Sequence, residues 1–251
     1  MFCVPLQVDG MRGVDLVCGA KGEGAAIGWL ESPAEPRDPD AWRWHALREA
    51  GWVMSLIAED MDGDGDRDVL FSDRRGGRRG CGWLENPGAE AVRGAWAEHP
   101  VGSAGKEVMF LDAADADGDG DLDVIAAVAP REVVIHHRIS PDGRRWEERV
   151  ISLPEGAGTS KSAAAGDVDL DGDADLVVTC ENAGGRSGLF WLSRREDAGE
   201  AGWEAREIGG IEGAKFDLVE LVDLDGDGDL DALTCEEREG LGVVWYENPA
   251  R

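Results

Sequence analysis

The chain of 251 residues has few basic side chains, a single tyrosine and no long hydrophobic run. Its 25 lysines and arginines stand against 53 aspartates and glutamates, which gives a formal net charge of −28. Such a charge repels phosphate groups and excludes a general binder of nucleic acids or anionic membranes. No stretch approaches the roughly 18 apolar residues of a membrane span. Residues 1–10 also show no signal peptide, since a basic end followed by an apolar run is missing.

The cysteines form no recognisable pattern. They are five, an odd number, and are widely spaced without a C-x-x-C pair, so we predict no disulfide framework. Hydrophobic residues make up 42% of the chain, which is enough for a packed core and more than a disordered acidic tail would have. The composition therefore predicts a globular protein.

An internal repeat organises the chain. The segments DMDGDGDRD, DADGDGDLD, DVDLDGDAD and DLDGDGDLD begin at Asp60, Asp115, Asp167 and Asp223, which are 55, 52 and 56 residues apart. A degenerate copy near the start keeps only Asp9 and Asp15. We predict five repeats of about 54 residues in a single domain over 1–251, with approximate bounds 1–50, 51–104, 105–157, 158–212 and 213–251.

Each repeat predicts four short strands. After the acidic segment come an apolar run such as VLFS, a tryptophan-centred run such as CGWLENP, the pattern W-x-x-[HR]-x-[VIL], and a run that leads into the next acidic segment. Helical spacing does not persist in any of them. Four short antiparallel strands repeated radially form a β-propeller. We expect an all-β fold, a β-propeller of five blades with four antiparallel strands per blade, the last blade lacking its outer strand. A fragment of a longer propeller fits the same pattern.

Tryptophans and histidines recur at repeat positions. The tryptophans are expected to pack blade against blade, and His45 and His99 of the outer strand are expected to be structural. The third repeat reads VVIHHR where the others have tryptophan, so we place His136 and His137 in the tryptophan slot.

The acidic segments predict metal sites. Aspartates at positions 1, 3, 5 and 9, with glycine at position 6 for a sharp turn, bring several hard oxygens to one centre. Carboxylates without a nearby histidine or cysteine favour Ca²⁺ over transition metals. An EF-hand needs glutamate at position 12, where this chain has Phe71, Ala126, Val178 and Thr234. The first repeat has Gln7 and Met11 in place of aspartates, so we expect no ion there.

The pattern D-x-D-x-D-G-x-x-D followed by an apolar strand resembles the FG-GAP and VCBS repeat family, whose relatives include the propellers of integrin α subunits. The resemblance extends over the whole chain and is nearest to bacterial members, which are commonly exported. It implies one Ca²⁺ in each intact loop between the first and second strands, hence four ions. The ligands that the resemblance implies are Asp60, Asp62, Asp64, Asp66, Asp68, Asp115, Asp117, Asp119, Asp121, Asp123, Asp167, Asp169, Asp171, Asp173, Asp175, Asp223, Asp225, Asp227, Asp229 and Asp231.

The face opposite the calcium loops is the predicted ligand site. The loops joining strands two to three and four to one lie on that face, and they carry all four lysines of the chain. Lysines near the propeller axis would create a local positive potential within an acidic protein. The candidate ligand-binding residues are Lys106, Lys161, Lys215, Trp52, Arg131, Glu181 and Glu236.

Two classes of function follow. The first is a non-enzymatic module that binds a glycan, an acidic small molecule or a protein. The alternative is a carbohydrate-active enzyme, a polysaccharide lyase or hydrolase, with an acid or base among Glu181, Glu236 and Asp217. No G-x-S-x-G or H-E-x-x-H motif is present, so binding is favoured. Loops suited to millimolar Ca²⁺ predict an exported protein, although unpaired cysteines oppose this.

Overall fold

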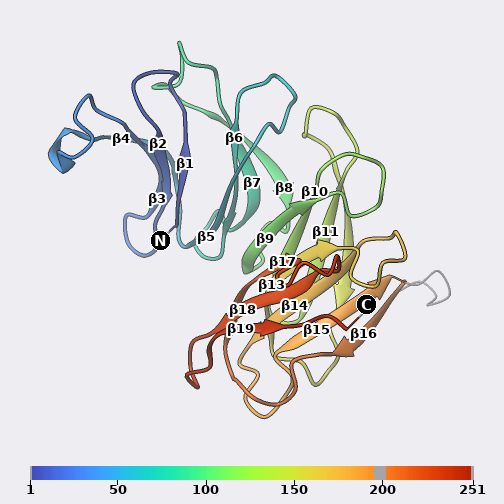
Figure 1. Ribbon diagram of the computed structural model, residues 1–251. Helices are drawn as coiled ribbons and strands as arrows, with labels where there is room; N and C mark the ends of the chain where they lie inside the picture. Colours follow the sequence, from blue (N-terminus) through green and yellow to red (C-terminus); the bar gives the residue numbers. More distant parts are fainter. Residues whose placement is uncertain (1, 195–201, 250–251) are drawn as a thin grey trace. The chain divides into compact units, whose positions relative to one another are not determined.

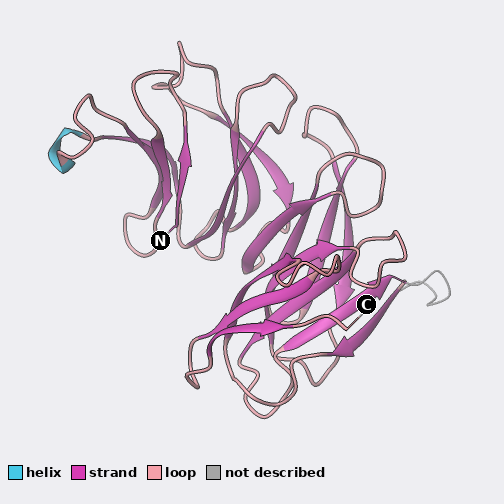
Figure 2. Ribbon diagram, in the orientation of Figure 1, coloured by secondary structure: helices cyan, strands magenta, loops and turns pink. Residues whose placement is uncertain are grey.

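The computed structural model of the chain describes residues 2–194 and 202–249. Residues 1, 195–201 and 250–251, which the sequence assigns to the first, fourth and fifth repeats, lie outside the described residues. Within this part, nearly all regular structure is β-strand, and a short 3-10 helix spans Pro39–Ala41 (Figure 2). None of its helices is long and apolar enough to cross a bilayer. The all-β prediction is confirmed.

The chain divides into two compact units, of which unit 1 comprises Met1–Val108 and Ile139–Trp146. It contains the sheets of repeats 1 and 2, each with four strands in chain order (Figure 1). The first sheet consists of β1 (Phe2–Leu6), β2 (Asp15–Gly19), β3 (Ala26–Glu31) and β4 (Arg43–Glu49). The second consists of β5 (Val53–Glu59), β6 (Asp68–Asp73), β7 (Gly80–Glu85) and β8 (Ala97–Gly102).

Unit 2 comprises Met109–Arg138 and Glu147–Arg251 and contains the sheets of repeats 3, 4 and 5, apart from the end residues Val108 and Trp146. The third sheet consists of β9 (Val108–Ala114), β10 (Asp123–Val128), β11 (Glu132–Arg138) and β12 (Trp146–Ser152). The fourth consists of β13 (Thr159–Gly166), β14 (Asp175–Glu181), β15 (Leu189–Arg194) and β16 (Trp203–Glu207). The fifth consists, within the described residues, of three strands: β17 (Phe216–Val222), β18 (Asp231–Glu236) and β19 (Gly242–Tyr246).

Hydrophobic clusters join the sheets of successive repeats inside each unit. Because side chains alternate between the two faces of a strand, Val69 and Phe71 of β6 share a face and pack in one cluster with Trp29 of repeat 1. In unit 2, one cluster joins repeats 3 and 4 and another joins repeats 4 and 5. Face-to-face packing of successive four-stranded sheets is the way in which propeller blades bury their apolar surfaces.

In four of the five repeats, the aspartate that begins the second strand links the acidic loop to the end of the third strand, and in repeat 4 Asp175 bonds to Arg194 of the third strand alone among the described residues. The Asp68 carboxylate accepts hydrogen bonds from the backbone N–H of Met61 in the loop (2.7 Å) and of Asn86 just beyond β7 (2.8 Å). Asp15 does the same with Val8 and Ser32, although its repeat lacks an intact acidic loop. These buried aspartates are therefore part of the fold as well as candidate metal ligands.

The strand register corrects one sequence-based interpretation. Trp83 of repeat 2 lies opposite Leu70, and the equivalent pair in repeat 3 is Ile135 opposite Ile125. Ile135 therefore occupies the tryptophan slot, and the prediction that His136 and His137 fill it was wrong. His137, two residues after Ile135, lies beside Asp123 at the start of β10 and Asp117 of the acidic loop.

His45 and His99 make structural contacts, as expected. The ring of His45 stacks on Trp29 with a centroid distance of 4.4 Å, and the ring of His99 lies tilted against Trp83 at 4.3 Å. Each histidine also pairs with a glutamate of the third strand: His45 with Glu31 at 2.9 Å and His99 with Glu85 at 2.6 Å.

Candidate functional site

The four intact acidic loops share one local geometry. In repeat 2 the Asp60 carboxylate accepts hydrogen bonds from the backbone N–H groups of Gly63 (2.8 Å) and Gly65 (3.0 Å). Both glycines have positive φ, 80° and 95°, which a side chain would disfavour. Asp115 and Asp223 accept the equivalent pair of bonds, whereas among the described residues Asp167 accepts only the one from Gly172 at position 6. The loops therefore curl around the first aspartate and bring the following carboxylates together.

Each loop gathers carboxylate oxygens that lie within 4.8 Å of one another. The four groups are Asp60, Asp62 and Asp68; Asp115, Asp117 and Asp119; Asp167, Asp169 and Asp171; and Asp223, Asp225 and Asp227. Asp66, Asp121 and Asp173, at position 7, are exposed and lie outside these groups of described residues. The buried Asp229 at position 7, Asp64 at position 5, and Asp175 and Asp231 at position 9 also lie outside these groups of described residues, so the structure brings together only part of each predicted ligand set.

The donors fit a hard divalent cation. Asp229 is 1% exposed, and neither of its carboxylate oxygens has a hydrogen-bond partner among the described residues. Oδ1 of Asp167 and Oδ2 of Asp175 are also buried without a hydrogen-bond partner among the described residues. Buried carboxylate oxygens are costly unless they are paired or bind a metal. Burial, together with the neighbouring charge of Asp227, raises the pKa of Asp229, and burial with the charge of Asp64 raises the pKa of Asp62. A cation would remove this repulsion.

Repeat 3 differs because a histidine stands beside its loop. Nδ1 of His137 lies 3.2 Å from Oδ2 of Asp117 and 3.2 Å from Oδ2 of Asp123. The expectation of loops without a nearby histidine was therefore wrong for this repeat. The available signal was the VVIHHR run, which forms the strand paired with β10.

In unit 1, cations gather around Trp52, in the loop between β4 and β5. Lys21, Arg74 and Arg75 lie over its ring at 4.8, 5.1 and 4.9 Å from the centroid. We call these four residues the Trp52 cluster. Arg74 also pairs with Glu107 at 3.1 Å. The loops that the sequence assigned to one face therefore meet in this unit, as the backbone bridge between Lys21 and Trp52 shows.

In unit 2, a buried lysine lies between two carboxylates. Lys161 is 4% exposed, and its Nζ lies 3.1 Å from Glu181 Oε2 and 3.1 Å from Asp217 Oδ1. We call these three residues the Lys161 cluster. Burial and, to a smaller extent, the hydrogen bond with Glu237 raise the pKa of Asp217. The charge of Lys161 lowers this pKa but does not outweigh them. Lys215 pairs with Glu237 nearby.

The remaining predicted ligand residues have local partners. Glu236 is buried, which raises its pKa, but backbone N–H groups including those of Ala214, Arg238 and Glu239 outweigh burial and lower it to about 2. Arg131 donates to the carbonyl oxygen of Glu155 at 2.6 Å. Lys106 is half-buried in the loop before β9.

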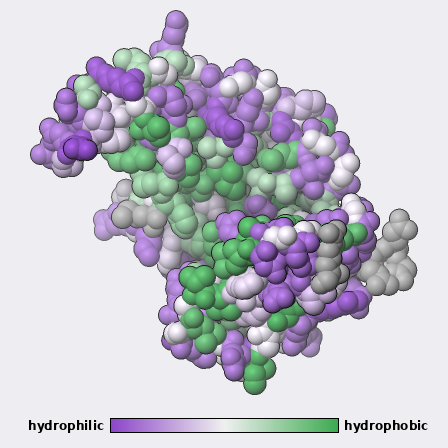
Figure 3. Space-filling view, viewed as in Figure 1, coloured by the Kyte–Doolittle hydropathy of each residue, from purple (hydrophilic) through white to green (hydrophobic). Residues whose placement is uncertain are grey.

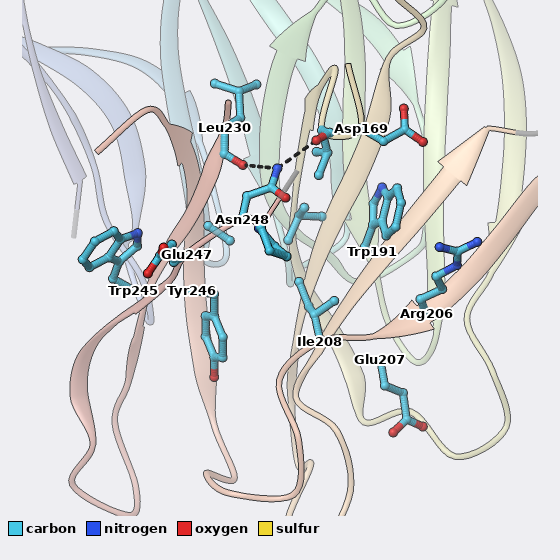
Figure 4. A pocket seen from close by; sticks show the side chains of 14 residues that line it. Asp169, Trp191, Arg206, Glu207, Ile208, Leu230, Trp245, Tyr246, Glu247 and Asn248 are labelled. Atoms are coloured by element: carbon cyan, nitrogen blue, oxygen red, sulfur yellow. Dashed lines mark hydrogen bonds between the residues drawn. The ribbon is translucent and has the colours of Figure 1, made fainter. Parts of the chain in front are cut away.

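A pocket of about 830 Å³ lies between the sheets of repeats 4 and 5. Figure 4 shows Trp191 and Trp245 from the two repeats, with Arg206 and Glu207 of β16 and with Asn248 hydrogen-bonded to Leu230. Trp191 is covered by Arg206 at 5.0 Å, whereas Trp245 is 43% exposed. This pocket was not predicted from the sequence. The feature of the sequence that could have indicated it is in repeat 5, where the run centred on Trp245 is not followed by a W-x-x-[HR]-x-[VIL] segment.

Comparison with known proteins agrees with the repeat geometry. The family model described as FG-GAP-like repeat matches residues 60–126 and 115–178. These residues belong to the FG-GAP-like repeat family. The matched segments of these FG-GAP-like repeats begin at the acidic loops of repeats 2 and 3 and end in the second strand of the next repeat. The resemblance stated from the sequence is confirmed over residues 60–178.

Solved structures show likeness at low identity. The periplasmic gluconolactonase PpgL of Pseudomonas aeruginosa is 13% identical with a TM-score of 0.50, over 94% of this chain and 70% of that protein. The biofilm matrix protein Bap1 of V. cholerae is 16% identical with a TM-score of 0.45, over 92% and 34%. A leech intramolecular trans-sialidase is 11% identical with a TM-score of 0.48, over 90% and 36%. The chain spans about a third of the latter two, and the likeness to PpgL concerns the fold alone. No curated protein matches the chain.

Proposed function

We propose that the chain is a calcium-binding β-propeller that acts as a non-enzymatic binding module. The observation that carries the metal part is a group of three aspartate carboxylates in each of four loops, with unpartnered buried oxygens in repeats 4 and 5. Oxygen-only donors of this kind suit Ca²⁺. The proposal includes five blades in one domain over 1–251, with Asp60, Asp115, Asp167 and Asp223 each opening a metal loop.

The proposed ligand is anionic, a glycan or an acidic protein segment, and the proposed site is the Trp52 cluster. Three cations around one indole give a positive potential in a protein of net charge −28. In the Trp52 cluster Glu107 pairs with Arg74, whereas Lys161 is buried between two carboxylates and Lys215 pairs with Glu237, so these two lysines support an anion site less.

Calcium binding is tested by calorimetry on the metal-free chain. Four ions are expected, which would change the net charge from −28 to about −20, and the melting temperature should fall in EDTA because an ion that binds only the folded state stabilises it. One site or none, or a melting temperature that EDTA leaves unchanged, would reject the proposal.

Ligand binding is tested on an array of sulfated and uronic-acid oligosaccharides, with and without Ca²⁺. The double variant Arg74→Ala/Arg75→Ala should lose binding. The matched control is Arg78→Ala/Arg79→Ala, which removes the same charge from the same hairpin but leaves the Trp52 cluster intact. Equal losses in the two variants would indicate nonspecific charge, and would reject the Trp52 cluster as the site.

A polysaccharide lyase or hydrolase is the second candidate, and the Lys161 cluster favours it. A lysine beside a carboxyl with a raised pKa is an arrangement found in acid–base catalysis. Asp217→Asn should then abolish the release of new chain ends from an acidic polysaccharide. Absence of any release by the wild-type chain would leave the binding function as the conclusion.

The proposal extends to export from the cell. Its support is the all-aspartate loops, which suit the millimolar Ca²⁺ found outside the cytosol. Fractionation of the native source tests it, and recovery of the protein only from cytosol would reject export.

A further inference from the structure

The acidic loop of repeat 3 has a donor that the other loops lack. The position of His137 on the third strand is filled by Glu31, Glu85, Ser193 and Glu247 in the other repeats. Glu85 pairs with His99 and Arg144. His137 instead directs Nδ1 at the two aspartates Asp117 and Asp123, 3.2 Å from each. A loop, β10 and β11 therefore each supply one ligand atom to the same point.

An imidazole with two carboxylates suits a different ion from that bound by carboxylates alone. Ca²⁺ takes oxygen ligands, whereas imidazole nitrogen favours Zn²⁺ and related ions. Ligand atoms about 2.0 Å from a tetrahedral Zn²⁺ lie about 3.3 Å from one another. The two measured separations from Nδ1 are both 3.2 Å, and the three donor atoms lie within 4.8 Å of one another.

The surroundings hold these donors in place and leave one side open. Asp123 is 1% exposed, and its carboxylate accepts hydrogen bonds from the backbone N–H groups of Ala116 (3.1 Å) and Arg138 (2.9 Å). Such supporting bonds orient a metal ligand. The side chains of His137 and Asp117 are 18% and 32% exposed, so water can reach a fourth coordination position.

We propose that repeat 3 contains a mixed nitrogen–oxygen site for Zn²⁺ or a chemically similar divalent ion, with Asp117, Asp123 and His137 as its protein ligands. The inference rests on the proposed metal-binding function and deepens it. In the presence of Zn²⁺ it assigns this repeat a different ion, so that three of the four proposed Ca²⁺ ions remain, in the loops that begin at Asp60, Asp167 and Asp223. His137, which stands where the other repeats have glutamate or serine, thereby gives one repeat of a common fold a different metal selectivity.

The test is equilibrium dialysis of the full chain against ZnCl₂ in excess CaCl₂, with both metals measured. The wild-type chain should retain one Zn²⁺ at this site. His137→Gln should weaken Zn²⁺ binding by at least the roughly 10–100-fold that loss of a supporting group costs. His137→Glu introduces the residue found in repeat 2, and it should lose Zn²⁺ while it gains Ca²⁺ in this loop.

Two controls exclude other metal ligands. His99→Gln removes a histidine that pairs with Glu85 and is not among the donors of repeat 3, and it should retain Zn²⁺. Cys3 and Cys18 face each other across β1 and β2 with their Sγ atoms 2.6 Å apart, so all variants are compared in a Cys3→Ser/Cys18→Ser background. Co²⁺ can replace Zn²⁺ as a spectroscopic probe, and its visible absorption should disappear in His137→Gln.

Failure of this inference and failure of the calcium proposal give different results. Zn²⁺ binding that is equal in the wild-type chain and both His137 variants, or no Zn²⁺ in the wild-type chain, would overturn the mixed site. Ca²⁺ bound at the other three loops is measured in the same samples. Its absence would instead count against the proposed calcium function.

Discussion

Leu170 is the fourth residue of the acidic loop of repeat 4, a position filled by glycine in the other intact loops. Its φ is 62°, and those of Gly63, Gly118 and Gly226 are 80°, 83° and 83°. A left-handed conformation costs an L-residue with a Cβ about 1–2 kcal/mol. Leu170 is also exposed, so its side chain contributes little packing to offset this cost.

Leu170→Gly should therefore stabilise the chain. The relief of strain exceeds the roughly 0.5–1 kcal/mol that glycine loses through its greater freedom in the unfolded state, so a net gain of about 0.5–1 kcal/mol is expected in urea unfolding. Leu224→Gly is the control, because Leu224 is exposed in the loop of repeat 5 but has no positive φ. A gain from the control as large as that from Leu170→Gly would contradict the explanation.

Glu31 is a residue whose charge stabilises unit 1. Arg93 donates to both of its carboxylate oxygens, at 3.2 and 2.9 Å, and His45 lies at 2.9 Å. The hydrogen bond from Arg93, opposed by burial and assisted by His45, lowers the pKa of Glu31 from 4.5 to about 2. The folded state therefore favours the charged carboxylate.

A carboxyl with a lowered folded-state pKa stabilises the fold above its unfolded pKa and loses that effect as the pH falls through the folded value. Glu31→Gln should thus cost about 1 kcal/mol at neutral pH, a modest figure because Arg93 is 41% exposed and its charge is screened. The cost should decline as the pH drops from 4.5 towards about 2. Unfolding of both proteins across this range checks it, and a cost independent of pH would refute the assignment.

At the scale of elements, β19 is an open edge of the fifth sheet within the described residues. Val243 and Trp245 are 74% and 43% exposed on this strand. Figure 3 shows hydrophobic residues at the surface of unit 2. In repeat 4 the equivalent strand β15 is covered by β16. Unpaired backbone groups beside exposed apolar side chains make an edge strand prone to pair with another chain.

A charge placed on β19 should therefore reduce self-association. Val243→Lys puts an ammonium group on the open edge without removing a buried side chain, so the melting temperature should stay nearly constant. Sedimentation velocity over a range of concentrations measures the effect. Val150→Lys, at a 49% exposed position of β12, is the control and should leave association unchanged. If the two variants associate alike, β19 is not the contact.

Sequence reasoning succeeded for elements whose signal is local. The second strand of each repeat directly follows the acidic loop, and adjacent strands of a sheet are joined by short loops. A sequence pattern within about 54 residues therefore specifies the strands of one repeat. It failed in repeat 3, where neither a tryptophan nor the ENP string marks the register. Pairs between repeats, such as Glu31 with Arg93, were not predictable, because packing of one sheet on the next brings together residues far apart in sequence.

At the scale of the molecule, the intact acidic loops are unevenly distributed. Unit 1 contains the degenerate loop of repeat 1 and the intact loop of repeat 2, whereas unit 2 contains the intact loops of repeats 3, 4 and 5. In repeat 1 the Asp15 carboxylate joins the loop to the third strand through hydrogen bonds alone. Bound metal should thus contribute least to the stability of repeat 1 and most to the stability of unit 2.

Removal of metal should therefore loosen unit 2 more than unit 1. An ion at about 100 times its dissociation constant contributes about 2.7 kcal/mol per site, so EDTA would withdraw about 2.7 kcal/mol from unit 1 and roughly 8 kcal/mol from unit 2. Hydrogen exchange reports local stability, and backbone amides of β13, β14 and β18 should lose protection while those of β2 and β3 keep it. Because β2 and β3 belong to the repeat without an intact loop, they serve as an internal control. A uniform loss of protection in both units would mean that the loops do not stabilise their own repeats.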